Sequence, residues 1–442
     1  MKTAIDIRSK SFKRYFANTS WLMGHRVFNM VVSLFVGVYV ARYLGPERFG
    51  LLSYAGSFVG LFTALATLGL NGIMVRELVK APGRKDELLG TAFWLKAGGA
   101  ILMWVGIAAA VPFTHNDTKT NILIVIIAFA VIFQAFNVID LNYQAEVKSK
   151  YVVYAQLVSL AISSITKLVF VWIVAPLVWF AWVFLLDAVV LAIGLTAIYL
   201  KTTGKVWYWK WRWQTAKELL RDSWPLILSG GAIMIQARID QVMLKEMIGS
   251  AEVGQYSVAM RMIEAFGFIP MVIYSSLAPS ITNAKKTNEI FYRQRLTQLY
   301  RLMFLLFLAV AIPIYLTAKP GVILLFGEAY AMAGWLLQLF AIRLFFTNLG
   351  VARSLFITNN NLFKYSFIAS VMGAILNIAF NYLLIPYYGA SGAIVATIIS
   401  FTFTIFVLDA CYSETKDNFI TMINGIWSFW RLFCEEFSKK NN

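Results

Sequence analysis

The sequence predicts an all-α integral membrane protein with 12 transmembrane helices in two six-helix lobes. Of its 442 residues, 60% are hydrophobic and only 14% are charged, whereas soluble domains carry roughly a quarter charged residues. Apolar runs long enough to span a bilayer recur from residue 18 to residue 411, which leaves no room for a soluble domain between them. Lysine and arginine are concentrated in alternate connecting segments, as in multi-pass membrane proteins.

A spanning helix needs about 20 mainly apolar residues. The sequence contains twelve such runs, at residues 18–44, 49–70, 90–113, 120–142, 151–173, 176–200, 223–246, 255–283, 298–318, 331–356, 363–385 and 389–411. We expect the eighth to bend, because proline removes a helical hydrogen bond and the run contains Pro270 and Pro279.

The distribution of positive charge predicts the orientation. With the N-terminus in the cytoplasm, the cytoplasmic segments hold 27 of the 39 lysines and arginines, and the opposite side holds 5. This bias follows the positive-inside rule and places both ends of the chain in the cytoplasm. The net charge of +17 is therefore mainly a topology signal, and we expect no nucleic-acid partner.

Residues 201–222 divide the spans six and six. They connect a predicted N-lobe, residues 1–200, to a predicted C-lobe, residues 223–411. Five aromatic side chains interleave here with two cations, a pattern that favours the headgroup layer; they are Trp207, Tyr208, Trp209, Trp211 and Trp213, with Lys210 and Arg212. We interpret the segment as a cytoplasmic linker that anchors at the interface. Residues 412–442 are predicted to form an amphipathic cytoplasmic tail.

A short glycine motif is repeated in the two halves at a constant offset of 204 residues. Leu44-Gly45, Gly50, Ser53 and Ala55 match Ile248-Gly249, Gly254, Ser257 and Ala259. With six spans in each half, the two copies have the same orientation. Folds with such parallel repeats place the substrate near the membrane midplane and work by alternating access.

Apart from charges at the ends of the spans, we single out eleven ionisable residues inside them, seven of them cations. Such residues are costly in a membrane and commonly mark a pathway. The candidates for a cationic substrate cavity are Arg26, Lys167, Arg238, Arg261 and Arg343. Polar residues at helical spacing are the candidates for its lining: Asn29, Ser33, Gln134, Asn137, Ser163, Asn377 and Asn381. Candidates for ion coupling are Asp187, Asp240 and Glu264.

Structural interpretations of the same residues stay open. Arg261 and Glu264 are three residues apart and could pair with each other. Each carboxylate could also compensate a nearby arginine. An excess of cations in a low-dielectric cavity nevertheless favours an anionic cargo, and the arginine fork suits phosphate oxygens.

Signals for catalysis are weak. The sequence contains no HExxH, CxxC or glycine-rich phosphate loop. We therefore expect no catalytic residue, no metal site and no cofactor. There is also no nucleotide-binding domain, so active transport would draw on an ion gradient, H⁺ or Na⁺.

Four segments resemble Wzx-type polysaccharide flippases, the polysaccharide-biosynthesis branch of the multidrug/oligosaccharidyl-lipid/polysaccharide exporter superfamily. They are ARYLGPERFGLLSYAGSF at 41–58, residues 223–264 with their RIDQ motif, FGEAYAMAGWLLQLFAI at 326–342 and NYLLIPYYGASGAIVAT at 381–397. The resemblance implies a two-lobed fold of the multidrug-and-toxin-extrusion (MATE) type with a V-shaped central cavity. Through the RIDQ motif, the resemblance implies that Arg238 and Asp240 are site residues.

The resemblance also implies the cargo and its setting. The cargo would be an undecaprenyl-pyrophosphate-linked oligosaccharide, moved from the inner to the outer leaflet of the bacterial inner membrane for O-antigen or capsule assembly. Membrane lipids, a polysaccharide polymerase and a chain-length regulator would be the partners. Two alternatives stay open: a multidrug/cation antiporter of the same fold, in which acidic residues should dominate the cavity, and a membrane scaffold for polysaccharide assembly.

Overall fold

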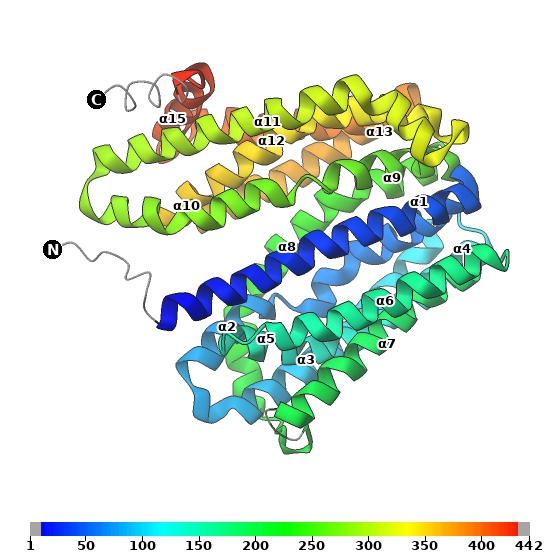
Figure 1. Ribbon diagram of the computed structural model, residues 1–442, viewed down its shortest axis with the longest axis horizontal. Coiled ribbons are helices and arrows are strands. Elements are labelled where there is room, and N and C mark those ends of the chain that lie inside the picture. The colour runs from blue at the N-terminus through cyan, green and yellow to red at the C-terminus, as the bar shows by residue number, and fades with distance from the viewer. Residues whose placement is uncertain (1–9, 203, 205, 432–442) are drawn as a thin grey trace. The chain divides into compact units, whose positions relative to one another are not determined.

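The computed structural model describes residues 10–202, 204 and 206–431. Their regular structure is helical throughout, with no β-strand in these ranges (Figure 1). The first part contains α1 Lys10–Thr67, α2 Leu70–Lys80, η1 Pro82–Arg84, α3 Lys85–Ala110, η2 Val111–Phe113, α4 Thr118–Ala130, η3 Val131–Asn137, α5 Val138–Ala145, α6 Lys150–Trp172, α7 Leu177–Thr202 and η4 Val206–Tyr208. The second part contains α8 Trp213–Met247, α9 Ser250–Glu264, α10 Phe268–Thr287, α11 Glu289–Phe326, η5 Glu328–Tyr330, α12 Ala331–Asn359, α13 Phe363–Thr402, the π-helical turn η6 Phe403–Val407, α14 Leu408–Cys411 and α15 Lys416–Trp427.

Within the described residues, nine helical stretches are long and apolar enough to cross a membrane. Two of them, residues 23–80 and 363–411, contain a glycine with a positive φ, Gly45 (71°) and Gly389 (54°), at which the helix is kinked. Helix α8 is not among the nine, because polar and charged residues, among them Arg238 and Asp240, are spread along it. The all-helical multi-pass fold is confirmed, and the count of twelve spans stays a prediction.

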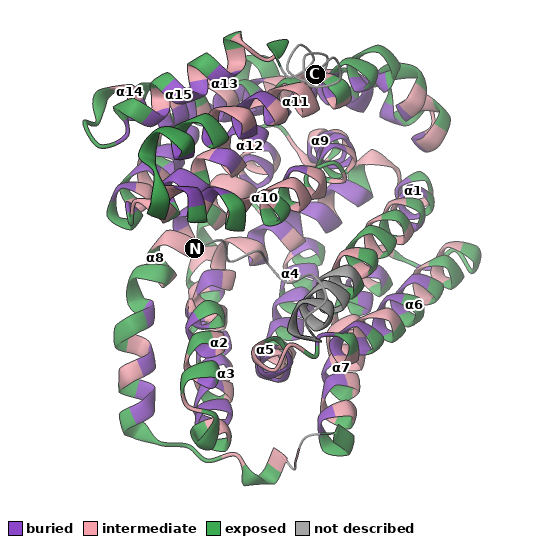
Figure 2. Cartoon of the chain, turned by 60° about the vertical axis from the view of Figure 1, so that its left-hand side comes forward, coloured by how far each residue is buried: buried purple, intermediate pink, exposed green. Residues whose placement is uncertain are grey.

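The surface of these helices is suited to lipid. Large apolar side chains such as Val125, Leu316 and Leu324 are mostly exposed, and exposed positions run along most of the helices (Figure 2). A soluble protein rarely exposes apolar surface on this scale, whereas hydrocarbon solvates it. The exposure therefore agrees with the hydropathy: this is a multi-pass membrane protein.

The helices form two compact units. The N-terminal unit comprises Met1–Leu44 and Leu51–Ile239, and the C-terminal unit comprises Gly45–Gly50 and Asp240–Asn442. In the N-terminal unit, α7 packs against α4 and α6, and α2 packs against α5. In the C-terminal unit, α12 packs against α9, α11 and α13. The lobe and linker boundaries drawn from the sequence stay a prediction.

The repeated glycine motifs meet inside the C-terminal unit. A Cβ atom added to Gly50 would stand 1.8 Å from the carbonyl oxygen of Ser250, and one added to Gly254 would stand 2.0 Å from that of Pro46. Ser250 follows Pro46, and Gly254 follows Gly50, by the same 204 residues. The contact is thus reciprocal, as expected for two copies related by a pseudo-two-fold axis. This symmetry supports the repeat inferred from the sequence.

The eighth predicted span is interrupted in the turn before Pro270. Helix α9 ends at Glu264, and α10 begins at Phe268. Proline lacks the N–H that would bond to the carbonyl four residues earlier, and its ring crowds that turn, so Pro270 favours a break at this position. Pro279 lies within α10. The expected bend is therefore present, at the first of the two prolines.

The aromatic-basic segment is held against the start of α3. The backbone N–H of Lys210 donates to the carbonyl of Asp86 (3.1 Å), and a Cβ at Gly90 would stand 2.6 Å from the Lys210 nitrogen. The Trp209 ring packs against Phe93 and Tyr199. Only Trp209 of the five aromatic residues is turned inward; the exposed four are Trp207, Tyr208, Trp211 and Trp213.

The predicted tail contains one described helix, α15. Its buried face, which includes Met422 and Gly425, packs against α11. Contact of this helix with the inner leaflet stays a prediction. Residues 432–442 of the predicted tail lie outside the described residues.

Candidate functional site

A buried carboxylate, Asp240 near the C-terminal end of α8, is the centre of a polar network in the C-terminal unit. It is 3% exposed. Its Oδ2 accepts hydrogen bonds from the hydroxyls of Tyr256 (2.6 Å) and Thr397 (2.8 Å), and its Oδ1 accepts one from Nδ2 of Asn381 (2.7 Å). Asn377 extends the network by donating to the Thr397 hydroxyl (3.2 Å). We call these five residues the Asp240 centre.

The kink of α13 brings three members of the Asp240 centre together. Asn377 and Asn381 lie on one face before the kink, four residues apart, and Thr397 lies after it. The reversal depends on the positive φ of Gly389, which glycine adopts without strain. Glu252 of α9 then caps the second segment, since its Oε2 accepts from the backbone N–H of Ala390 (3.2 Å).

The chemistry of the Asp240 centre is that of a hard-cation or proton site. Within the described ranges, every hydrogen-bond partner of the Asp240 carboxylate is neutral, and an ionised carboxylate in a membrane protein interior is costly without a positive partner. Oδ1 of Asn381 is buried and accepts no hydrogen bond. Carboxylate, amide and hydroxyl oxygens are the ligands that hard cations prefer. Among the described residues, no group of three His, Cys, Asp or Glu side chains is placed to hold a metal.

Two of the predicted substrate cations have no carboxylate partner among the described residues. Arg238 is half-buried, and its Cγ would lie 3.4 Å from a Cβ at Gly60 of α1. Arg343 lies over the rings of Phe340 (5.7 Å) and Phe401 (5.6 Å), and its buried Nε donates no hydrogen bond. Both guanidinium groups therefore keep hydrogen-bond donors for an anionic ligand.

The remaining predicted cations lie in different surroundings. Arg261 is exposed and stacks over the Phe49 ring at 4.8 Å. Its pairing with Glu264, one of the structural interpretations from the sequence, stays a prediction, and Glu264 is itself exposed. Arg26 is exposed on α1, and Lys167 is half-buried on α6. Arg238 belongs to the N-terminal unit and Asp240 to the C-terminal unit, since the unit boundary falls between them.

The predicted polar lining is divided between the two units. In the N-terminal unit, Ser33 donates to Asn29 (2.9 Å), and buried Ser163 donates to the Leu160 carbonyl. Asn137 is half-buried, and Gln134 is exposed. Asn377 and Asn381 are fully buried in the Asp240 centre. Asp187, a candidate for ion coupling, accepts a hydrogen bond from Ser159 (2.7 Å).

Comparison with known proteins adds to this geometry. A model of the family described as "Polysaccharide biosynthesis protein" matches residues 15–285, more than half of the chain. The chain belongs to the polysaccharide biosynthesis protein family. A protein of Shigella flexneri named as a candidate O-antigen transporter is 23% identical over 412 residues, which are 86% of this chain and 93% of that protein.

Solved structures show the fold of this polysaccharide biosynthesis protein. An inward-facing multidrug resistance transporter of the MATE family matches with a TM-score of 0.71 and 16% identity, over 91% of this chain and 95% of that one. The lipid II flippase MurJ in an inward closed conformation matches with a TM-score of 0.70 and 14% identity, over 93% and 92%. A transporter of the same superfamily from Pyrococcus furiosus matches with a TM-score of 0.54 and 14% identity, over 94% of each chain. The predicted MATE-type fold is confirmed.

Sequence reasoning missed two neutral members of the Asp240 centre, Tyr256 and Thr397, although it named Asn377 and Asn381 as polar lining. Neither hydroxyl carries a charge, and a lone threonine hydroxyl in a helix commonly bonds to its own backbone. Lys96 of α3 was counted among the intramembrane charges but not chosen as a site candidate; it is buried and donates to Oδ1 of Asn71 on α2 (2.8 Å). Its charge within the apolar run 90–113 was the available signal.

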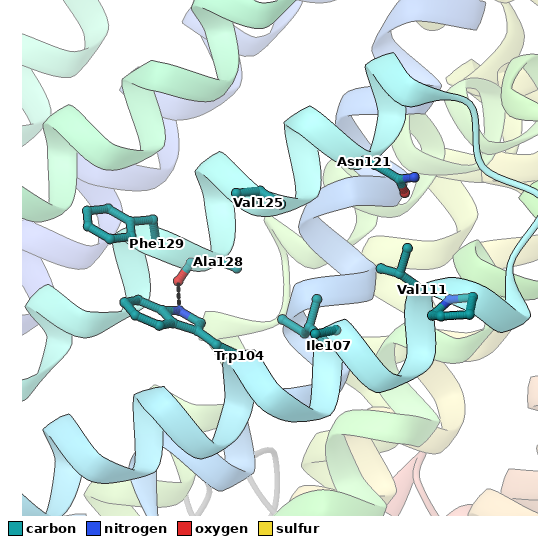
Figure 3. Close-up of a pocket in the computed structure, with 9 residues that line it drawn as sticks. Trp104, Ile107, Val111, Asn121, Val125, Ala128 and Phe129 are labelled. Carbon is teal, nitrogen blue, oxygen red and sulfur yellow. Dashed lines mark hydrogen bonds between the residues drawn. The ribbon is translucent and has the colours of Figure 1, made fainter.

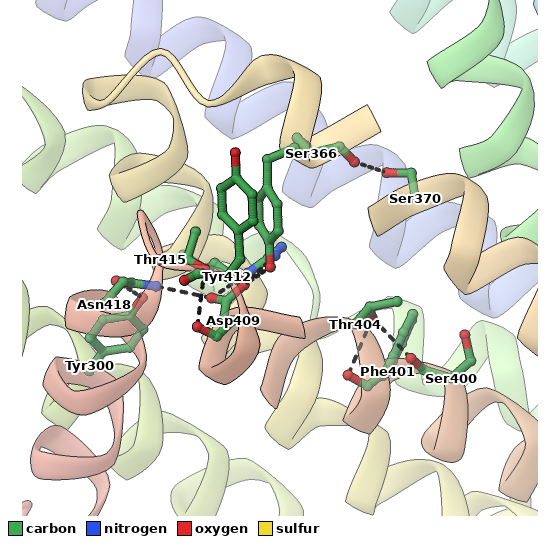
Figure 4. A network of polar contacts seen from close by, with 12 residues as sticks. Tyr300, Ser366, Ser370, Ser400, Phe401, Thr404, Asp409, Tyr412, Thr415 and Asn418 are labelled. Atoms are coloured by element: carbon green, nitrogen blue, oxygen red, sulfur yellow. Dashed lines mark hydrogen bonds and ion pairs between the residues drawn. The ribbon is translucent and has the colours of Figure 1, made fainter. Parts of the chain in front are cut away.

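One intramembrane cation has a structural role in this family member. Arg353 forms a bidentate ion pair with Asp409, whose side chain is fully buried. Tyr365 also donates to Asp409, and Asn418 of α15 links Asp409 to Tyr300 (Figure 4). We call these five residues the α15 latch. The latch ties α15 to α11, α12, α13 and α14, and it leaves Arg353 no free charge for a substrate.

Proposed function

We propose that this protein is a flippase for undecaprenyl-pyrophosphate-linked oligosaccharide repeat units. Similarity to the candidate O-antigen transporter over 86% of the chain carries this proposal. The family described for polysaccharide biosynthesis and the fold shared with a lipid II flippase support it. The protein would act in the bacterial inner membrane, with both termini in the cytoplasm, and it would make and break no covalent bonds.

The unpaired arginines support an anionic cargo. A pyrophosphate cannot cross hydrocarbon at a useful rate, because its charges lose their hydration there. Arg238 and Arg343 keep guanidinium donors without carboxylate partners in the described part of the chain. We propose that Arg238 binds the pyrophosphate during alternating access, and Arg26, Lys167, Arg261 and Arg343 stay candidates for contact with the anionic cargo.

The Asp240 centre supports coupling to an ion gradient. A cation or proton that reaches Asp240 would neutralise the carboxylate, and Oδ1 of Asn381 would gain a partner. Neutralisation would also change the hydrogen bonds that join α8, α9 and both segments of α13. Binding of H⁺ or Na⁺ at the Asp240 centre would therefore alter how these helices pack against one another. Asp187 and Glu264 stay secondary candidates for this role.

Complementation of a flippase-null strain tests the function. The wild-type chain should restore surface polysaccharide and clear the lipid-linked repeat units that accumulate without a flippase. Arg238→Gln should fail at matched membrane expression, and Arg238→Lys should restore part of the activity, because a cation without the bidentate fork still attracts phosphate. A wild-type chain that leaves the lipid-linked units in place, or that changes only drug susceptibility, would contradict the proposal and favour the antiporter.

A separate experiment tests the coupling ion. Transport in proteoliposomes should require a pH gradient or a Na⁺ gradient, and Asp240→Asn should abolish this requirement or the transport itself. Glu246→Gln is a matched control on α8, because Glu246 pairs locally with Lys245 (3.0 Å). If transport by Asp240→Asn still responds to the gradient as in the wild type, the Asp240 centre has no part in coupling.

A further inference from the structure

The helical stretch of residues 23–80 is interrupted between α1 and α2. Leu68 and Gly69 both have a positive φ, 50° and 62°. A leucine adopts this conformation only at an energetic cost, and strained backbone of this kind clusters at functional sites. The break therefore calls for a closer look at the groups around it.

The break lies close to the middle of the bilayer. Asn71, in the first turn of α2, precedes the last residue of that helix, Lys80, by nine residues, or roughly 14 Å at 1.5 Å per residue. Lys96 follows the first residue of α3, Lys85, by eleven residues, or roughly 16 Å. Half the hydrocarbon thickness of a bilayer is about 15 Å. Both residues thus lie at the depth where transporters with internal repeats bind their substrates.

The first turn of α2 presents hydrogen-bond donors. The N–H groups of Leu70, Asn71 and Gly72 have no acceptor within their own helix. The N-cap residue is Gly69, and no side chain of the described structure caps the helix. A Cβ added to Gly72 would meet no atom within 4 Å, and Asn71 and Gly72 are exposed. Space for a ligand therefore adjoins donors that lipid cannot satisfy.

A buried lysine adds positive charge to the same turn. Lys96 of α3 is 4% exposed, and its Nζ donates to Oδ1 of Asn71 at 2.8 Å. This bond uses one of the three ammonium donors and leaves the amide nitrogen of Asn71 as a further donor. A helix N-terminus is itself positive, so a lysine beside it is unfavourable without an anion. We call Lys96 and residues 70–72 the Lys96 site.

The neighbouring carboxylate does not pair with this lysine. Asp140, half-buried on α5, acts electrostatically on Lys96, but among the described residues the two form no ion pair. A buried ammonium is costly when no anion is in contact with it. An oxyanion has several acceptor oxygens and therefore matches a set of backbone, amide and ammonium donors.

Two other features of the N-terminal unit are separate from the Lys96 site. A pocket of about 410 Å³ between α3 and α4 is lined without a charged side chain, and the indole N–H of Trp104 bonds there to a backbone carbonyl at 2.8 Å (Figure 3). Arg238 packs against Gly60, which precedes Gly69 by nine residues, or roughly 14 Å of helix. The pocket does not suit an anion, and Arg238 would be a second contact at a distance.

We propose that the Lys96 site binds a phosphate-type oxyanion, held by the N–H groups of the first turn of α2, the Asn71 amide and the Lys96 ammonium. The assignment of this anion to the pyrophosphate of the carried lipid rests on the proposed flippase function. The pyrophosphate would then occupy the Lys96 site and the Arg238 contact in turn. Asp140 lowers the affinity by like-charge repulsion, which allows the anion to leave.

Removal of the lysine charge tests the proposal. Binding of inorganic pyrophosphate to the purified full-length chain would be measured by isothermal titration calorimetry. Lys96→Met should weaken binding about tenfold or more, because hydrogen bonds from a charged group are lost. Lys80→Gln is the matched control on α2, where exposed Lys80 pairs with Glu77 (3.5 Å). Its charge lies more than a Debye length from the site, so the affinity should stay within about twofold.

Asp140→Asn should have the opposite effect. It removes a like charge and should strengthen pyrophosphate binding several-fold, which a purely structural role of the lysine and carboxylate does not predict. Unchanged binding in Lys96→Met, an equal loss in Lys80→Gln, or weaker binding in Asp140→Asn would overturn the proposal. If Lys96→Met does not purify as a monodisperse protein, Asn71→Ala serves with the same expected direction, because it removes the amide donor at an exposed position.

A second probe identifies the source of the anion. Binding of undecaprenyl phosphate would be measured on the same variants by native mass spectrometry. A loss of both probes in Lys96→Met assigns the Lys96 site to the carried lipid, whereas a loss confined to inorganic pyrophosphate assigns it to a free anion.

Failure of this inference is distinguishable from failure of the proposed function. Complementation of the flippase-null strain by the wild-type chain reports on the function alone. A wild type that complements while Lys96→Met binds pyrophosphate normally refutes the Lys96 site and leaves the flippase. A wild type that does not complement refutes the flippase, and the pyrophosphate titration still decides whether the Lys96 site binds an oxyanion.

Discussion

The reciprocal contact of the two glycine motifs predicts that alanine substitutions in them lower the stability in a non-additive way. Alanine at Gly50 or Gly254 would put a Cβ 1.8 or 2.0 Å from a backbone carbonyl oxygen of the opposite motif. To restore a separation of about 3.5 Å, the two motifs must move apart by roughly 1.5–1.7 Å. Both contacting atoms belong to backbone, so no side-chain rotation can relieve the overlap.

The expected cost follows from overpacking. Such insertions destabilise by about 1–3 kcal/mol, and the better helix propensity of alanine returns up to about 1 kcal/mol. Because both overlaps are with backbone atoms, we take the upper end of this cost and expect a net loss of about 2 kcal/mol for either single substitution. For a unit of some 200 residues this lowers the Tm by about 4–8 °C. Gly56→Ala is the control on the same helix, since no atom lies within 4 Å of its added Cβ, and it should not lower the Tm.

The double substitution distinguishes one reciprocal contact from two independent contacts. One outward movement of the motifs makes room for both new methyl groups, so Gly50→Ala/Gly254→Ala should cost about as much as one single substitution and not the sum. Thermal unfolding in detergent, followed by fluorescence-detected size exclusion, measures all four proteins. Additive losses, or a Gly50→Ala protein as stable as Gly56→Ala, would refute the reciprocal contact.

Three further predictions follow from other parts of the structure. Asp409→Asn leaves the buried guanidinium of the α15 latch without its charge partner and should destabilise the C-terminal unit by about 3–5 kcal/mol, measured as a lower Tm. Gly90→Ala should free the segment around Lys210 from α3 and expose it to limited proteolysis. Burial acts to raise the pKa of Glu146, but hydrogen bonds from Lys148 and Lys85 lower it below its ordinary value. Stability from Glu146 is therefore present above its unfolded pKa of about 4.3 and is lost as the pH falls below it, so the Tm of the wild type should fall more steeply with acid than that of Glu146→Gln.

Long-range polar contacts explain what the sequence could predict and what it could not. Hydropathy locates helices because each span needs about 20 apolar residues, and this requirement is local. Tyr256 and Thr397 meet Asp240 only because α13 reverses at Gly389. The sequence predicts the end of one span at residue 385 and the start of the next at 389, but it gives no sign of which distant hydroxyl the carboxylate will find. Asp240, Asn377 and Asn381 were therefore recognised as candidates, while Tyr256 and Thr397 were not.

The burial of Arg353 and Asp409 is a second feature that the sequence alone does not predict. Arg353 and Asp409 were visible as charges near helix ends, where headgroups offer an inexpensive environment. The structure instead pairs them in a buried, bidentate contact, completed by a tyrosine and by Asn418 from beyond the last predicted span. A sequence shows that two opposite charges exist, but the choice between lipid headgroup and internal partner depends on tertiary packing.

The internal repeat bears on where coupling can reside. The glycine motifs recur at an offset of 204 residues and pack reciprocally, so the backbone of the two halves packs in the same way at this motif. The position 204 residues before Asp240 is Val36, and the position before Tyr256 is Leu52. The repeat therefore preserves the packing but not the polar chemistry, and the N-terminal copy of this helix pair has no carboxylate at the position of Asp240. If Asp240 couples transport to an ion, the coupling is a property of the C-terminal unit, and the introduction of Val36→Asp should not create a second coupled ion in the measured stoichiometry.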